Sequence, residues 1–196
     1  KAQINAVTKP SPKQPNVVYF NTIDSFYENL DKMWLHQTLN MDPASLAIHR
    51  AMGSNYSTLL HFELISEGVK SSYPSYSPHE AFHVLDAGCG MGAGLAWNSI
   101  HNPNWNLLGL TLSSRQYSFI SQNLTKRYNF SVTLQSYDKL TMQYHAIYSV
   151  EALVHSPNLT YTMKVWASHL HPGGVVALID DYLLSPGIIN QLRWVC

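Results

Sequence analysis

The chain has 196 residues, which is enough for one domain with a sizeable core. Twelve Lys and Arg residues balance twelve Asp and Glu residues, and only 12% of the residues are charged. No basic excess therefore points to nucleic acid or to an anionic membrane surface. With no signal peptide and no apolar run near 18 residues, the sequence predicts a cytoplasmic protein without a membrane span.

The ten histidines and two cysteines do not form a recognisable ligand pattern. The histidines are scattered, without Cys/His pairs at the spacing of metal ligands, so we predict no metal site. Cys89 lies in a predicted turn and Cys196 ends the chain, which gives no disulfide framework.

The N-terminal part divides into an arm and a helical segment. Residues 1–16 carry three prolines among Lys, Ser and Gln, which is typical of a linker. Residues 17–80 predict helices near 22–35, 45–52 and 57–69, with Gly68 as a possible C-cap of the last. These helices either pack on a sheet or form a lid over a ligand, and both alternatives stay open.

Residues 81–196 alternate apolar strands with helices. Strands are expected at 82–86, 105–112, 132–135, 145–150 and 175–179, helices at 92–100, 113–128 and 157–170, and a turn at 171–174. This alternation predicts a Rossmann-like, doubly wound α/β fold with a mainly parallel sheet and helices on both faces. Ligands on such sheets lie beyond the carboxyl ends of the strands. Polar residues follow the expected strands there: Asp86, Thr111, Asp138, Glu151 and Asp180.

A glycine-rich turn follows the first expected strand and reads V-L-D-A-G-C-G-M-G-A-G over residues 84–94. Its glycines allow close approach of a ligand, and the following helix start should present free backbone N–H groups. Dinucleotide sites use similar glycines but need a carboxylate about 20 residues later, which the second expected strand lacks. Asp86, ahead of the glycines, would repel a pyrophosphate but can face the ammonium group of a methionine moiety.

Four segments together resemble the class I S-adenosylmethionine (SAM)-dependent methyltransferases, in the subgroup of cyclopropane synthases, sterol methyltransferases and natural-product O-methyltransferases. They are V-L-D-A-G-C-G-M-G at 84–92, G-L-T-L-S-S-R-Q at 109–116, S-Y-D at 136–138, and S-V-E-A-L-V-H-S-P-N-L at 149–159 with the L-H-P-G-G strand that follows. The resemblance implies SAM as cofactor, a small-molecule acceptor and a role in natural-product biosynthesis.

The resemblance also implies a set of cofactor-binding residues. They are Asp86, Gly88, Cys89, Gly90, Gly92, Thr111, Leu112, Gln116, Tyr137 and Asp138, with Tyr27 from the helical segment. Two alternatives remain: Gln116 is an ordinary exposed helix residue, or Asp138 caps a loop turn.

For the chemistry, the resemblance aligns His155 and Asp180 with an active-site histidine and aspartate. We expect O-methylation of a hydroxylated metabolite, with His155 as general base and Asp180 orienting it or binding the acceptor hydroxyl. His155 could instead cap the following helix. Glu151 would hold the methionine ammonium, or neutralise a cationic transition state if the acceptor were an alkene or lipid carbon. A SAM-binding partner domain without activity is the third alternative.

The C-terminal end departs from the resemblance. Class I methyltransferases continue past the fifth strand through a helix and an antiparallel pair of strands, whereas this sequence ends at Cys196. We therefore expect a shortened core whose acceptor side is completed by an additional segment or subunit.

Overall fold

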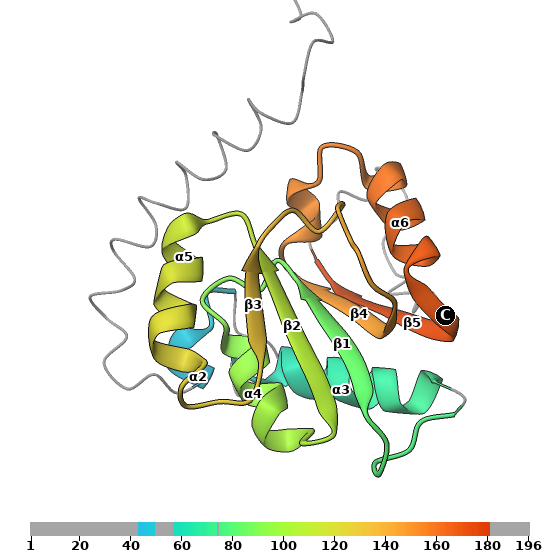
Figure 1. Cartoon of the computed structure of the whole chain (residues 1–196), viewed down its shortest axis with the longest axis horizontal. Coiled ribbons are helices and arrows are strands. Elements are labelled where there is room, and N and C mark those ends of the chain that lie inside the picture. The colour runs from blue at the N-terminus through green and yellow to red at the C-terminus, as the bar shows by residue number, and fades with distance from the viewer. Residues whose placement is uncertain (1–42, 50–56, 74, 181–196) are drawn as a thin grey trace, which may run out of the picture.

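The computed structural model describes residues 43–49, 57–73 and 75–180, and within them a five-stranded sheet lies between helices (Figure 1). The strands are β1 (Phe82–Ala87), β2 (Trp105–Thr111), β3 (Ser131–Leu134), β4 (Tyr144–Val150) and β5 (Leu170–Ile179). Their order is β3-β2-β1-β4-β5, and every neighbouring pair is parallel. The predicted parallel, doubly wound sheet is confirmed.

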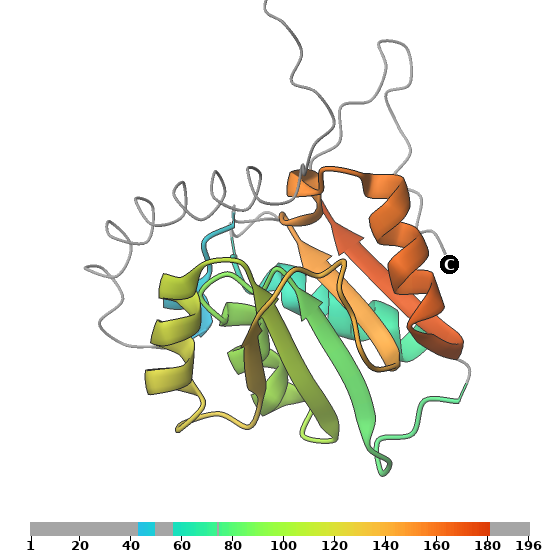
Figure 2. The same ribbon diagram turned by 45° about the horizontal axis from the view of Figure 1, so that its top comes forward.

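Helices cover both faces of this sheet. They are α2 (Pro43–Leu46), α3 (Leu60–Ser72), α4 (Ala93–His101), α5 (Ser114–Phe119), a π-helix (Ile120–Leu124), a 3-10 helix (Leu153–His155) and α6 (Leu159–Ser168). Helices α3 and α4 pack on one face, whereas Trp166 of α6 packs on the other face against Leu85 and Ile147. Figure 2 shows α3 and α6 on opposite sides of the sheet.

The central strand β1 runs through the core to the carboxyl end of the sheet. Val84, Leu85 and Ala87 are fully buried, because helices cover this strand on both faces. Strand β3, at the edge, is mostly exposed. The buried run of β1 leads directly into the glycine-rich turn.

The predicted turn at 171–174 falls within strand β5. Strand β5 runs from Leu170 to Ile179 through this segment, and Gly173 has a φ of +79°. The pairing of β4 with β5 is irregular between Tyr144 and Ala146. Between the pairs Tyr144–Leu170 and Ala146–Val175, β4 advances by two residues and β5 by five, so β5 accommodates three additional residues in this segment.

Two predicted helices differ in type or extent. The helix expected over 113–128 is α5 followed by a π-helix that ends at Leu124, and the side chains of Ser121 and Asn123 donate to backbone carbonyls one turn earlier. Such side-chain bonds compete with the regular helical pattern. The helix expected over 157–170 begins at Leu159, because the Asn158 side chain accepts from the backbone N–H of Tyr161 (3.0 Å).

The N-terminal helices also differ from the expectation. The helix expected over 45–52 is α2 (Pro43–Leu46), and residues 47–49 are not helical. Gly68 lies inside α3, whose C-cap is Tyr73. The helix expected near 22–35 lies outside the described residues.

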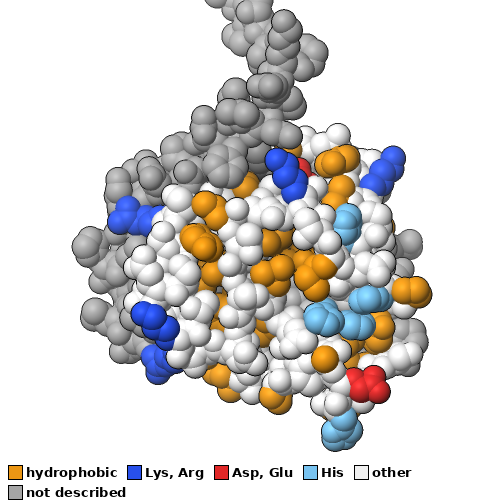
Figure 3. Space-filling view, in the orientation of Figure 1, with side chains coloured by type: hydrophobic (Ala, Val, Ile, Leu, Met, Phe, Trp, Pro, Cys, Tyr) orange, Lys and Arg blue, Asp and Glu red, His pale blue; other side chains and the backbone are white. Residues whose placement is uncertain are grey.

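Figure 3 shows the surface of the face seen in Figure 1, with apolar side chains near its middle and basic side chains scattered toward the rim. The rings of His83, His145 and His171 lie close together. The ring centroids of His83 and His145 are 5.6 Å apart, and those of His145 and His171 are 4.4 Å apart. Within the part of the chain that the structure describes, no group of three His, Cys, Asp or Glu side chains is arranged to hold a metal ion. None of the described helices combines the length and apolarity that crossing a membrane requires.

Candidate functional site

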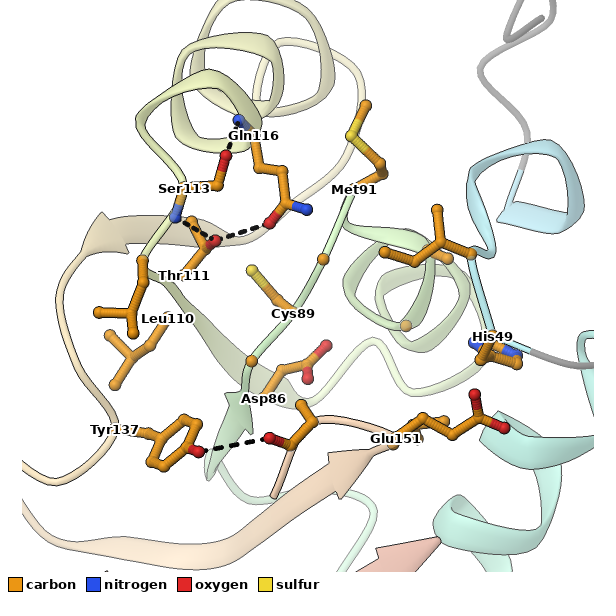
Figure 4. Close-up of a pocket in the computed structure, with 18 of the residues that line it drawn as sticks. His49, Asp86, Cys89, Met91, Leu110, Thr111, Ser113, Gln116, Tyr137 and Glu151 are labelled. Carbon is orange, nitrogen blue, oxygen red and sulfur yellow. Dashed lines mark hydrogen bonds between the residues drawn. The ribbon is translucent and has the colours of Figure 1, made fainter. Parts of the chain in front are cut away.

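A cavity of about 260 Å³ lies at the carboxyl ends of β1, β2 and β4, where ligands of parallel sheets bind (Figure 4). Its walls come from the glycine-rich turn, the β2–α5 connection, the loops after β3 and β4, and the segment before α3. The lining residues are Leu46, Ile48, His49, Phe62, Asp86, Gly88, Cys89, Gly90, Met91, Ala93, Gly94, Leu110, Thr111, Leu112, Ser113, Gln116, Gln135, Tyr137, Val150, Glu151, Ala152 and His155.

The glycine-rich turn brings β1 against the loop after β4. Gly88 has a φ of +91°, and a Cβ at this position would overlap the Cβ of Ala152. The N–H groups of Gly88 and Cys89 donate to the carbonyl oxygen of Leu110 at 3.0 and 2.9 Å. Hydrogen bonding between these two parallel strands thus extends into the turn and uses the N–H groups of Gly88 and Cys89, whereas the predicted free N–H groups are those at the start of the following helix.

Asp86 lies on the floor of the cavity with only 4% of its surface exposed. The hydroxyl of Tyr148 donates to its Oδ2 at 2.8 Å. Burial raises the pKa of the Asp86 carboxyl to about 7, and the hydrogen bond from Tyr148 lowers it in part. Burial also raises the pKa of the Cys89 thiol well above its usual range, so this thiol stays protonated and is a poor nucleophile.

A compact hydrogen-bond corner holds the wall formed by β2 and α5 (Figure 4). The Thr111 hydroxyl donates to Oε1 of Gln116 at 2.7 Å and accepts from the N–H of Ser113 at 3.1 Å. The Ser113 hydroxyl in turn accepts from the N–H of Gln116 at 3.2 Å and caps α5. Gln116 is 2% exposed, which excludes the alternative that it is an ordinary surface residue.

The end of β4 carries the second carboxylate of the cavity. Glu151 has a φ of +48°, and it is the non-glycine residue with positive φ among those that the structure describes. This left-handed conformation costs a non-glycine residue roughly 1 kcal/mol or more and is typical of functional sites. In Figure 4 its carboxylate points toward His49, on the opposite wall.

The lining of the cavity is acidic. Asp86 and Glu151 line it, and no Lys or Arg is among the described residues that form its walls. His49 and His155 are its titratable bases. Burial lowers the pKa of His49, so its ring is neutral near pH 7. A cavity of this kind suits a cationic ligand and disfavours a pyrophosphate.

Comparison with known families agrees with this site. The family described as mycolic acid cyclopropane synthetase matches residues 77–183, which is more than half of the chain. The chain belongs to the mycolic acid cyclopropane synthetase family. The resemblance to cyclopropane synthases among the class I SAM-dependent methyltransferases is confirmed. No curated protein sequence matches the chain.

Solved structures share the fold of this family member. The cyclase SpnF superposes with a TM-score of 0.64 at 17% identity, over 80% of this chain and 58% of SpnF. Mycolic acid cyclopropane synthase CmaA1, complexed with SAH and CTAB, superposes with a TM-score of 0.63 at 20% identity, over 86% of this chain and 57% of CmaA1. Magnesium protoporphyrin IX methyltransferase (ChlM) from Synechocystis PCC 6803 with bound SAM superposes with a TM-score of 0.55 at 13% identity, over 81% of this chain and 74% of ChlM. The chain thus spans under two thirds of the length of SpnF and CmaA1.

Most of the residues predicted from the sequence lie together on the cavity of this family member. They are Asp86, Gly88, Cys89, Gly90, Thr111, Leu112, Gln116, Tyr137, Glu151 and His155. Gly92, Asp138 and Asp180 are not among the lining residues, and Tyr27 lies outside the described residues. Gly92 instead is the N-cap residue of α4, with a φ of +86°. The Oδ1 atom of Asp138 is buried and has no hydrogen-bond partner within the described chain.

Asp180 does not line the cavity but contacts the 3-10 helix that does. Its Oδ2 accepts from the N–H of Val154 at 2.9 Å, so it holds the 3-10 helix that carries His155 to the cavity wall. This contact agrees with an orienting role and leaves binding of the acceptor without support. His155 does not cap the following helix, because Asn158 occupies the cap position.

Among the lining residues that the sequence did not indicate, His49 is an ionisable one. Its Nε2 donates to the carbonyl oxygen of Thr58 at 2.6 Å, which leaves Nδ1 as the acceptor of the neutral ring. The ring lies 4.2 Å from that of His61 and 5.1 Å from that of Phe62, measured between centroids. No local motif surrounds His49, and only the packing of the segment before α3 brings it to the site.

Proposed function

We propose that this family member is a SAM-dependent methyltransferase that acts on a small-molecule acceptor. The observation that carries the proposal is the cavity itself: its described lining combines a glycine-rich turn with the carboxylates Asp86 and Glu151 and contains no Lys or Arg. SAM is cationic at its sulfonium and its ammonium groups, so this lining fits it. The SAM and SAH complexes of ChlM and CmaA1 support the same ligand.

The residues divide between two ends of the cavity. Asp86 would hold the ammonium of the methionine moiety, and the buried corner of Thr111 and Gln116 would face the nucleoside, with Tyr137 beside it. Glu151 and His155 would face the acceptor. Bound in this way, SAM supplies an electrophilic methyl group, and the protein aligns the acceptor and excludes water.

Calorimetry with SAM and with SAH tests the cofactor assignment. We expect heat of binding with both, and absence of heat with both would remove the proposal. Methyl transfer needs its own test, because the shared fold also belongs to the cyclase SpnF. Labelled SAM offered with a panel of hydroxylated metabolites and unsaturated lipids should label an acceptor. Binding without any labelling would favour a partner domain without activity.

For the acceptor we propose oxygen methylation with His155 as general base. The ring lies on the cavity wall, and the 3-10 helix that carries it is held by Asp180. A histidine can take the proton of a hydroxyl near neutral pH, and such general-base help contributes about 10²- to 10⁴-fold in rate.

Methylation of carbon is a second candidate, which the geometry of Glu151 favours. Its carboxylate is kept in the cavity although its backbone is in the left-handed region. A carboxylate there would stabilise a cationic transition state on an alkene, and the family of cyclopropane synthetases also supports this reaction.

Two variants separate the candidates. For oxygen methylation, His155→Ala should lower kcat by about 10²-fold or more and leave the affinity for SAM within about threefold, with Glu151→Gln having the smaller effect. For carbon methylation, this order should reverse. Full activity of His155→Ala on a hydroxyl acceptor would rule out the assigned base.

A further inference from the structure

Asp86 is the end of a buried hydrogen-bond chain that runs away from the cavity into α4. Its Oδ2 accepts from Tyr148 at 2.8 Å, and the Tyr148 oxygen lies 3.3 Å from Nδ2 of Asn98. Asn98 Oδ1 accepts from Asn102 at 2.8 Å, and Asn102 also bonds to Ser66 of α3. Apart from Asp86 and Tyr148, which lie on neighbouring strands, every member belongs to a helix or its cap.

The direction of donation along this chain follows from one backbone contact. Nδ2 of Asn98 lies 3.0 Å from the carbonyl oxygen of Gly94, which can only accept. The same amide nitrogen faces the Tyr148 oxygen, so that oxygen accepts, and the hydroxyl proton of Tyr148 points to Asp86. The chain therefore donates toward Asp86, which favours its ionised form.

Gly94 makes room for this pair. A Cβ at Gly94 would lie 2.8 Å from the Tyr148 hydroxyl and 3.0 Å from Oδ2 of Asp86. The first distance is shorter than real Cβ contacts and the second is tighter than most of them, so a larger residue would require both groups to shift. The start of α4 is shaped around the contact between Tyr148 and Asp86.

Few other titratable groups lie beside Asp86. The Cys89 thiol is the nearest on the turn, and it stays protonated because burial and the Asp86 charge raise its pKa. Gly94 and Phe62 face Asp86 from α4 and α3 without a titratable group. Glu151, His49 and His155 line the same cavity from its other walls. Tyr148 is thus the direct polar partner that the described structure gives to the carboxylate.

We propose that Tyr148, held by Asn98, is the positioning residue of the cofactor site: it directs the Asp86 carboxylate and sets the pH at which this carboxylate becomes ready to bind the cofactor's ammonium. This inference rests on the proposed function. Burial opposes ionisation of Asp86. The Tyr148 hydroxyl and the ammonium of a bound cofactor both favour the ionised carboxylate. Cofactor binding therefore expels a proton from Asp86 at neutral and acidic pH.

The affinity for SAM should then weaken as pH falls. With the pKa of Asp86 near 7, the affinity at pH 6 should be about tenfold below its limit at higher pH. We call this fall in SAM affinity toward low pH the acid limb. Tyr148→Phe removes the hydroxyl donor and should move the acid limb up by about one pH unit. The fall in SAM affinity toward high pH comes from deprotonation of the cofactor's own ammonium, so the variant should leave it unchanged.

The test is calorimetric titration with SAM from pH 5.5 to 8.5 on the full chain and its variants. Tyr144→Phe is the matched control, since it removes a buried tyrosine hydroxyl from the same strand but from the other core cluster. His49→Gln is the second control and should keep the acid limb. An affinity loss in Tyr148→Phe that is equal at every pH would overturn the proposal, as would an acid limb that vanishes in His49→Gln.

A measurement on the unaltered chain covers the case in which Tyr148→Phe does not fold. Binding heats in two buffers of different ionisation enthalpy give the number of protons released. We expect a net release of about 0.7–0.8 proton at pH 6.5, and a change to net proton uptake near pH 8, where the ammonium of the free cofactor is partly deprotonated. No release at pH 6.5, with normal binding, would refute the role of Tyr148 and leave the proposed function intact. Absence of SAM binding at every pH would instead refute the proposed function.

Discussion

The two ends of the cavity are built from different parts of the chain and are held in different ways. At the cofactor end, Asp86 and Gln116 are almost fully buried, and hydrogen bonds from neighbouring strands and helices direct their polar atoms. At the acceptor end, His155 lies on a three-residue 3-10 helix, and His49 lies on a non-helical segment. The cofactor end is thus held by buried side chains, whereas the acceptor end joins Glu151, which is bonded to β5, with histidines on short segments.

The difference shows how the site divides its tasks. Every substrate of the proposed enzyme would share one cofactor, so the cofactor end can be rigid and part of the core. The acceptor end uses short segments that can change without disturbing the sheet, as is common for loops that carry specificity. Substitutions at the two ends should therefore separate cofactor affinity from acceptor use.

The largest effect should come from Gly88→Val, at the cofactor end. A side chain here meets Ala152, and the φ of +91° strains any branched residue. We expect the free energy of unfolding to fall by about 3 kcal/mol and SAM affinity to fall by more than 100-fold. Urea unfolding and calorimetry measure both.

Gly68→Ala is the control for Gly88→Val. Gly68 lies inside α3 and away from the cavity lining, so alanine should raise the free energy of unfolding by about 0.5–1 kcal/mol and leave affinity unchanged. A Gly88→Val protein that binds SAM normally would show that close approach of the turn is not needed.

Asp86→Asn should separate stability from binding at the same end. Because the folded-state pKa of Asp86 is about 7, its contribution to stability is full below about pH 4 and is lost as pH rises through 7. Asparagine imitates the protonated form, so at pH 8 we expect a gain on the order of 1–2 kcal/mol without cofactor, and no gain below pH 4. SAM affinity at pH 8 should fall at least tenfold.

Urea unfolding at both pH values measures that gain. A loss of stability at pH 8 in Asp86→Asn would contradict the stated cost of burying the charge. Unchanged SAM affinity would contradict the role given to the carboxylate.

The smallest effect is expected at the acceptor end, from His49→Gln. Glutamine keeps a donor for the Thr58 carbonyl but loses the ring that faces Glu151. We expect the KM for the acceptor to rise about three- to tenfold, with the dissociation constant of SAM unchanged. Steady-state kinetics with the identified acceptor measures this. A matching loss of cofactor affinity would break the proposed separation of the two ends.

The cofactor end could be predicted from the sequence because its residues lie in short contiguous patterns. Asp86, Gly88 and Gly90 follow one strand, and Thr111 and Gln116 follow the next, so strand ends alone bring them together. Tyr148 could not be found in this way. It lies within an apolar strand, and its contact with Asp86 depends on β4 being the neighbour of β1.

The acceptor end was predicted less well for a similar reason. His49 approaches the site through packing of a distant segment, and Asp180 supports the helix of His155 instead of lining the cavity. The segment 171–174 was predicted as a turn that precedes the fifth strand, and it lies within β5 because glycine and proline mark both turns and irregular strands. Sequence patterns thus gave the strands and the cofactor end, whereas contacts between distant segments needed coordinates.

The left-handed backbone at Glu151 has a consequence for how this position can vary among natural sequences. Glycine adopts that conformation at no steric cost, and asparagine adopts it more easily than other residues do. A lineage that no longer needs the carboxylate should therefore drift to glycine, which relieves the strain in a single step. The amino acid at this position should therefore indicate whether a homologue still needs a carboxylate in the cavity.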